Sequence, residues 1–122
     1  MKIDEFADKA QTQDNSNLFS KYDGSLDIVP NEIQSFYAKF NPSSVEIGYN
    51  GTSIHLIPAE NLIKENKYYD SMNIGFVFAT CDGDPIFYHE GKVYTCPHGV
   101  KNPEWELLAE SVEEYFNLII SK

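Results

Sequence analysis

Residues 75–116 decide the fold, with GFVFATCDGDPIFYHEGKVYT running from Gly75 to Thr95 and WELLAESVEEYF from Trp105 to Phe116. In the first part, runs of aromatic and β-branched residues are separated by two short links rich in Asp, Gly and Pro, at 82–85 and 90–91. Such runs and links predict a three-stranded antiparallel meander. In the second part, apolar residues recur at helical spacing after Asn102-Pro103. We therefore expect a helix over 103–120 that packs on the sheet and leaves Trp105 largely buried.

The chain before the meander predicts a hairpin and two further helices. Pro30 suits a first helical turn, apolar residues follow at positions 33, 36, 37 and 40, and Asn41-Pro42 ends the pattern, which predicts a helix over 30–41. Asn50-Gly51 separates two alternating runs, 45–49 and 53–57, and is typical of a two-residue hairpin. A short helix is expected over 58–66. The sequence thus predicts an α+β fold, in which one antiparallel sheet of hairpin and meander packs against helices.

The first 25 residues are polar and weakly patterned. We expect a weakly ordered N-terminal arm over 1–25 and the folded domain over 26–122. Phe6, Ala7 and Ala10 have the spacing of a short helix, and the apolar pair Leu18-Phe19 is expected to attach the arm to the body. A chain of 122 residues has the usual size of a single domain.

The charge of the chain is strongly acidic. Nineteen acidic residues face nine lysines, there is no arginine, and the formal net charge is −10. Binding of nucleic acid depends on Lys and Arg that neutralise phosphates, so this composition argues against it. It favours a basic protein as partner, although acidity also serves solubility alone. The sequence shows neither a secretory signal nor an apolar run of membrane-spanning length, so we expect a cytoplasmic protein in which Cys81 and Cys96 are free thiols.

The residue types that carry chemistry do not form a known catalytic or metal-binding pattern. Cys81, His89, Cys96 and His98 fall within eighteen residues, but their spacings differ from those of zinc sites. The sequence also contains none of the motifs of hydrolases, phosphate-binding loops or dinucleotide-binding folds. Ser111 is expected in the middle of a helix, without a histidine close to it in sequence. We therefore expect no catalytic residue, no metal and no cofactor.

The remaining candidate is a binding surface. From residue 81 onward, eight acidic residues stand against three lysines. We predict that the residues around the turns of the meander form an acidic, aromatic-bearing patch that holds a partner, namely Asp82, Asp84, Glu90, Tyr88 and Tyr94. The alternative is that these acids are ordinary turn residues and a solvated helix face.

Four stretches of the chain, taken in order, resemble one superfamily. They are VPNEIQSFY at 29–37, IGFVFA at 74–79 followed by GDPI at 83–86, GKVY at 91–94, and Trp105 with AESVEEYF at 109–116. Together they are similar to the SUKH superfamily, which includes the yeast cell-wall-assembly regulator and many bacterial immunity proteins. The resemblance covers about residues 26–120. Asn41-Pro42-Ser43 stands where the family usually has Asn-Gly-Gly, and Val112 where it has Phe, which leaves the subfamily open.

The resemblance implies a non-enzymatic binding domain, and we expect it to be a monomer or weak dimer. In bacteria such a domain typically neutralises a toxin, often a nuclease or a nucleic-acid deaminase. A regulatory interaction module with a non-toxin partner is the alternative. A small enzyme or ligand-binding protein is a third class, and it would require a concave pocket with titratable groups of perturbed pKa.

Overall fold

Two-residue turns join the strands of the meander. The computed structural model describes residues 5–120 and contains β4 (Phe76–Cys81), β5 (Asp84–His89) and β6 (Lys92–Thr95). Both residues of each turn have positive φ, at 52° and 88° for Asp82-Gly83 and 49° and 88° for Glu90-Gly91. This is the backbone of type I′ turns, whose twist matches that of the flanking strands. The predicted meander is confirmed, with Asp84 and Pro85 inside β5 rather than in the turn.

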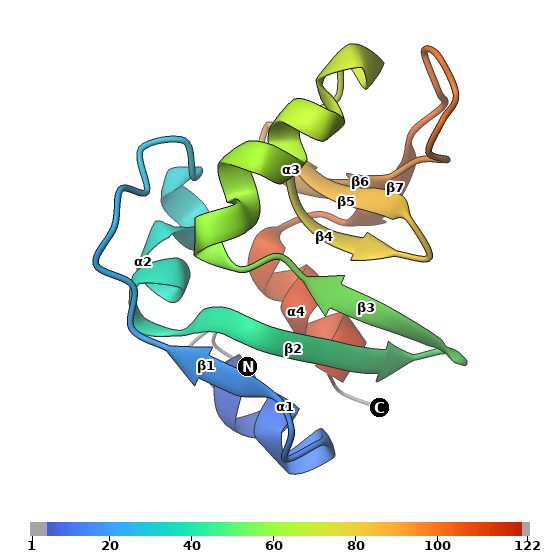
Figure 1. The fold of residues 1–122 in the computed structure, drawn as a ribbon. Coiled ribbons are helices and arrows are strands. Elements are labelled where there is room, and N and C mark those ends of the chain that lie inside the picture. The colour runs from blue at the N-terminus through green and yellow to red at the C-terminus, as the bar shows by residue number, and fades with distance from the viewer. Residues whose placement is uncertain (1–4, 121–122) are drawn as a thin grey trace.

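Seven antiparallel strands follow one another in sequence order across the sheet (Figure 1). The predicted hairpin is present as β2 (Asn41–Tyr49) and β3 (Thr52–Leu56), and β3 pairs with β4. The edges are β1 (Leu18–Ser20) and β7 (Glu106–Ala109). The fold is therefore α+β in a single domain, as predicted.

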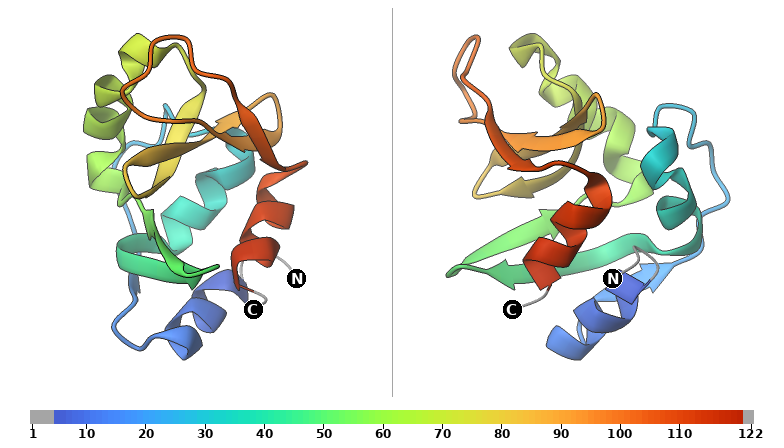
Figure 2. Two further views of the ribbon diagram at one scale, coloured as in Figure 1. Left: turned by 90° about the vertical axis from the view of Figure 1, so that its right-hand side faces the viewer. Right: turned by 180° about the vertical axis from the view of Figure 1, so that it is seen from behind.

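The helices cover both sides of this sheet. They are α1 (Phe6–Gln13), α2 (Asn31–Lys39), α3 (Leu62–Tyr68) and α4 (Val112–Ile120), with short 3₁₀ turns η2 (Ala59–Asn61) and η3 (Asp70–Met72). In the side view of Figure 2, α3 lies on one side of the meander and α4 on the other. Among residues 5–120, no helix combines the length and the apolar character needed to cross a membrane.

The prediction of a helix over 103–120 is wrong for the first half of this range. Residues 106–109 form β7, which pairs with β6 so that Val93 faces Ala109 and Thr95 faces Glu106. This pairing satisfies backbone groups of β6 that a helix would have left at an open edge. The helix begins only at Val112. Trp105 therefore lies on the loop before β7 with 37% of its surface exposed, and the prediction that it is largely buried is also wrong.

The segment before residue 26 contributes to the core and to the sheet. Phe6 on α1 is fully buried and stacks on Phe116 of α4, with ring centroids 4.6 Å apart. The buried side chain of Asn17 donates to the carbonyl of Ala10 and accepts from the backbone N–H of Glu46 on β2. The short helix that the spacing of Phe6 and Ala10 suggests is present.

Candidate protein-binding surface

The two turns that carry the predicted acidic patch lie at opposite ends of β5. Asp82 and Asp84 stand at the turn before β5, and Glu90 stands at the turn after it. Glu90 lies six positions after Asp84, and a strand rises about 3.3 Å per residue, so roughly 20 Å lies between them. The structure brings Asp82 and Asp84 together and places Glu90 elsewhere.

The two predicted tyrosines lie on opposite faces of the sheet. Tyr94 pairs with Phe87 across β5 and β6, and the two rings stack with centroids 5.8 Å apart. Tyr88 follows Phe87, so its side chain points to the other face. There its hydroxyl donates to the carboxylate of Glu32 on α2, which raises the pKa of Tyr88 above its ordinary value. Tyr94 therefore lies on the face where Trp105 packs and remains a candidate for the binding surface, whereas Tyr88 is engaged by α2 on the other face.

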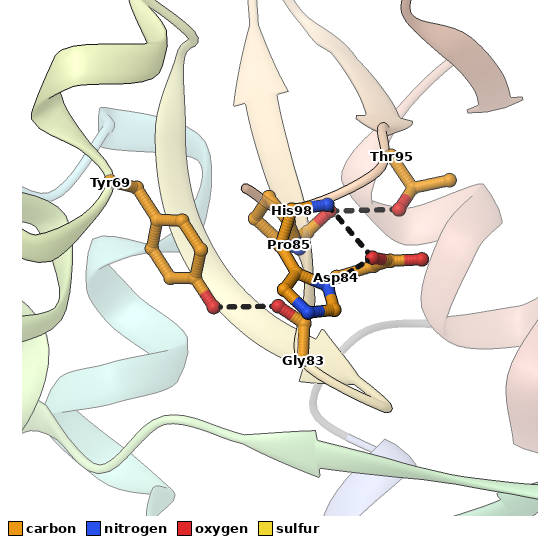
Figure 3. A network of polar contacts seen from close by, with 6 residues as sticks. All are labelled: Tyr69, Gly83, Asp84, Pro85, Thr95 and His98. Atoms are coloured by element: carbon orange, nitrogen blue, oxygen red, sulfur yellow. Dashed lines mark hydrogen bonds and ion pairs between the residues drawn. The ribbon is translucent and has the colours of Figure 1, made fainter. Parts of the chain in front are cut away.

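A polar network fixes the loop between β6 and β7 to the turn before β5 (Figure 3). One oxygen of Asp84 accepts the backbone N–H of His98 at 2.9 Å and lies 2.7 Å from Nδ1 of the same residue. The ring of His98 covers Gly83, because a Cβ on this glycine would lie 3.1 Å from the ring. The hydroxyl of Tyr69, beside η3, donates to the carbonyl of Gly83 at 2.9 Å. Asp84 thus holds the loop against the turn, and Tyr69 in addition holds the turn.

The chemistry of this network is that of a structural pair rather than an activated nucleophile. Cys96 lies close by and is buried, with 3% of its surface exposed. Burial, and then the negative charge of Asp84, raise the pKa of the Cys96 thiol. Reactive cysteines show the opposite shift. Within residues 5–120, no three His, Cys, Asp or Glu side chains are grouped so as to hold a metal ion.

Four carboxylates gather at the end of the sheet where this loop is attached. We call Asp82, Asp84, Glu104 and Glu106 the acidic end, because together they line two adjoining hollows there. Asp84 is paired with His98. The other three side chains form no hydrogen bond or ion pair with any residue between 5 and 120. Elsewhere in the described chain some acidic residues do have partners, for example Glu110 with Lys92 at 3.4 Å.

Trp105 is the main apolar group at the acidic end. Its indole packs against three rings on the same side of the sheet, those of Phe87 at 4.9 Å, His89 at 5.0 Å and Tyr94 at 5.3 Å between centroids. Val100 and Leu107 nearby are also exposed. An aromatic ring fixed by its neighbours, yet open to solvent, is an anchor of the type found at protein interfaces.

The first hollow, which we call the Trp105 hollow, has a volume of about 490 Å³. Trp105, Val100, Pro97 and Pro103 supply its apolar lining, and Asp84, Glu104 and Glu106 supply its carboxylates. The second, the hairpin hollow, has a volume of about 370 Å³ and lies between the turns at 50–51 and 82–83, β7 and α4. Asp84, Thr95 and Glu106 line both.

A helix over 103–120 places Glu104 and Glu106 in its first turn and buries Trp105. The sequence therefore includes the two acids in the acidic set but does not predict an exposed Trp105 beside them. The signal that corrects this is Ser111-x-x-Glu114, a capping-box pattern that places the helix start at residue 111. The Asp84–His98 pair has no comparable local signal.

The fold and this surface define the chain as a small α+β domain with an acidic, aromatic-bearing end. Comparisons with family models, with curated proteins and with solved structures found no match.

Proposed function

We propose that the chain is a non-enzymatic protein-binding domain that binds a basic protein through the acidic end and Trp105. In the bacterial setting implied by the SUKH resemblance, the partner is a nuclease or deaminase toxin and the chain is its immunity protein. The observation that carries the proposal is that three carboxylates without partners in residues 5–120 lie at the same end of the sheet as the exposed, well-packed Trp105, and that two of them, Glu104 and Glu106, line its hollow.

Electrostatics gives this surface a role in encounter. The net charge of −10 attracts a basic protein over long range, and the acidic end offers carboxylates that need not break an existing ion pair to accept it. A toxin that binds nucleic-acid phosphates presents Lys and Arg, so an acidic inhibitor is complementary in charge to its active surface. After encounter, burial of the Trp105 indole supplies the short-range affinity.

The experiment begins with the protein encoded by the gene next to this one, tested for toxicity in cells with and without this chain. Binding is then measured by calorimetry at 150 mM salt for the double variant Glu104→Lys, Glu106→Lys. We expect affinity to fall by roughly 30-fold to 700-fold, since each of the two reversed contacts costs about 1–2 kcal/mol and ~1.4 kcal/mol is a factor of ten. Trp105→Ala should cost at least about 2 kcal/mol.

The matched control is the double variant Glu90→Lys, Glu113→Lys. It makes the same change in net charge at exposed positions toward the other end of the meander, beyond the Debye length of about 8 Å. We expect affinity to stay within about threefold, because only screened charge is altered. Equal losses in both variants, or none in the first, would exclude the acidic end as the interface. A partner that binds but is not toxic would favour a regulatory module over an immunity protein.

A further inference from the structure

The hairpin hollow has an apolar floor beneath a carboxylate rim. Ile54 of β3, Ile86 of β5 and Ile119 of α4 are almost fully buried and form the floor together with the ring of Tyr115. Leu108 of β7 and Leu118 of α4 stand higher and are partly exposed. In the left view of Figure 2, the turn between β2 and β3 and the turn between β4 and β5 face the viewer. The hollow can thus receive an aliphatic chain that enters from the end of the sheet.

The rim of the hollow carries negative charge from three different elements. Asp82 lies on the turn after β4, Asp84 opens β5 and Glu106 opens β7. No lysine within residues 5–120 lines the hollow. Neither Asp82 nor Glu106 is engaged by any residue in that range, and Asp84 uses one oxygen for His98. The occupant that suits both parts is therefore an aliphatic stem that ends in a cation.

The arrangement of the carboxylates distinguishes between the two cationic side chains of proteins. Arginine presents a flat fork that suits one carboxylate bound through both oxygens. Lysine ends in a compact ammonium with three donors on a four-carbon stem. Carboxylates contributed by three separate elements around one opening match the ammonium, and the buried isoleucines match the stem.

We propose that the hairpin hollow binds the side chain of a lysine presented by the partner protein, with the ammonium among Asp82, Asp84 and Glu106 and the stem on Ile54, Ile86 and Ile119. The identity of the partner rests on the function proposed above, whereas the specificity of the hollow for an aliphatic ammonium does not. The Trp105 hollow and the hairpin hollow then form adjacent parts of one interface, joined at Asp84 and Glu106.

The hollow is tested without any partner, with hexylammonium as the probe. Methyl NMR shifts of Ile54, Ile86 and Ile119 should change saturably, with a dissociation constant of about 10 mM, which is reasonable for seven non-hydrogen atoms. Hexanol lacks the charge that the carboxylates attract, and methylammonium lacks the stem that packs on the isoleucines. Each should therefore bind at least about fivefold more weakly than hexylammonium. Absence of saturable shifts at these methyl groups, or equal binding of hexanol, would overturn the proposal.

Two neutral variants separate the rim of this hollow from the rest of the acidic end. Asp82→Asn with Glu106→Gln removes two rim charges, and Asn tolerates the positive φ of 52° at position 82. We expect binding of hexylammonium to weaken at least about fivefold. Glu104→Gln is the control, since Glu104 lines the Trp105 hollow and not the hairpin hollow, and it should leave the probe's affinity within about twofold. Equal weakening by the control would show a general charge effect and contradict the assigned site.

The two proposals fail independently. If hexylammonium does not bind while Glu104→Lys with Glu106→Lys abolishes binding of the partner, the lysine site is wrong and the protein-binding function is supported. If hexylammonium binds as described but the double variant leaves binding of the partner unchanged, the lysine site is supported and the proposed interface is wrong. If both hold, replacing each lysine of the partner by glutamine in turn should identify one whose loss weakens the complex at least about tenfold.

Discussion

Tyr37 and Tyr115 keep their phenol groups inside the hydrophobic core. The hydroxyl of Tyr37, on α2, donates to the carbonyl of Ile57 at 2.8 Å, and both rings are about 2% exposed. Burial raises the pKa of both tyrosines well above the ordinary value of 10.0. Each phenol therefore stays protonated in the folded chain at a pH where it ionises in the unfolded chain.

We expect this burial to set the alkaline limit of stability. Below pH 10 the folded and unfolded chains hold these two protons equally, and the stability is fully present. Above pH 10 only the unfolded chain releases them, so the free energy of unfolding should fall by about 1.4 kcal/mol per pH unit for each tyrosine. Urea unfolding followed at pH 9, 10, 11 and 11.5 measures the slope. Tyr37→Phe removes one of the two groups and should reduce the slope by that amount. An unchanged slope in this variant would contradict the assignment to Tyr37.

The start of α4 is defined by a reciprocal pair of hydrogen bonds. The hydroxyl of Ser111 accepts the backbone N–H of Glu114 at 3.0 Å, and the carboxylate of Glu114 accepts the backbone N–H of Glu110 at 2.6 Å. The first bond satisfies a donor that the helix start would otherwise leave free, and the second holds the residue before Ser111 against the first turn. The expectation that Ser111 lies in the middle of a helix is wrong for this reason: it is the residue at which β7 gives way to α4.

Loss of this cap should destabilise the domain without changing its fold. Ser111→Ala removes the acceptor and should lower the free energy of unfolding by about 1 kcal/mol, as measured by urea denaturation. Ser111→Asp keeps an acceptor at the same position and should remain within a few tenths of a kcal/mol of the parent. If the alanine variant were as stable as the aspartate variant, the cap would not be what fixes the boundary between β7 and α4.

Elements set by local chemistry could be predicted from the sequence, and elements set by distant pairing could not. Asn50-Gly51 and Glu90-Gly91 carry the positive φ that their hairpins need within two residues. By contrast, Leu107 and Leu108 fit the spacing of a helix as well as that of a short strand. They form β7 because this segment pairs with the edge of β6, which the local sequence does not reveal. For the same reason the candidate site was predicted in part. The Asp-Gly-Asp-Pro link predicts that Asp82 and Asp84 lie at a turn of the meander, whereas the position of Trp105 and its neighbouring acids depends on where β7 lies.

The first and last helices, α1 and α4, contact each other and complete the hydrophobic core. In both figures that show the entire chain, α1 lies beside α4. Phe6 is the centre of this contact: its ring stacks on Phe116 and meets the edges of Phe19 and Phe36, so it links α1, β1, α2 and α4. Residues 6–20 are thus one side of the core rather than an arm laid over a finished domain.

Replacing Phe6 tests this view at the scale of the whole chain. Phe6→Ala leaves a large cavity between four elements and should lower the free energy of unfolding by about 3–5 kcal/mol, a large part of the stability of a domain of this size. Leu18→Ala, in the same segment but at a side chain that is 56% exposed, should change it by less than about 0.5 kcal/mol. Urea denaturation followed both by far-UV circular dichroism and by Trp105 fluorescence measures the two variants. Because Trp105 lies at the far end of the sheet from α1, the two signals should still change together in the parent, as expected of one cooperative unit. If Phe6→Ala were nearly neutral, or if it shifted only the circular dichroism transition, α1 would be an independent arm and the core would close without it.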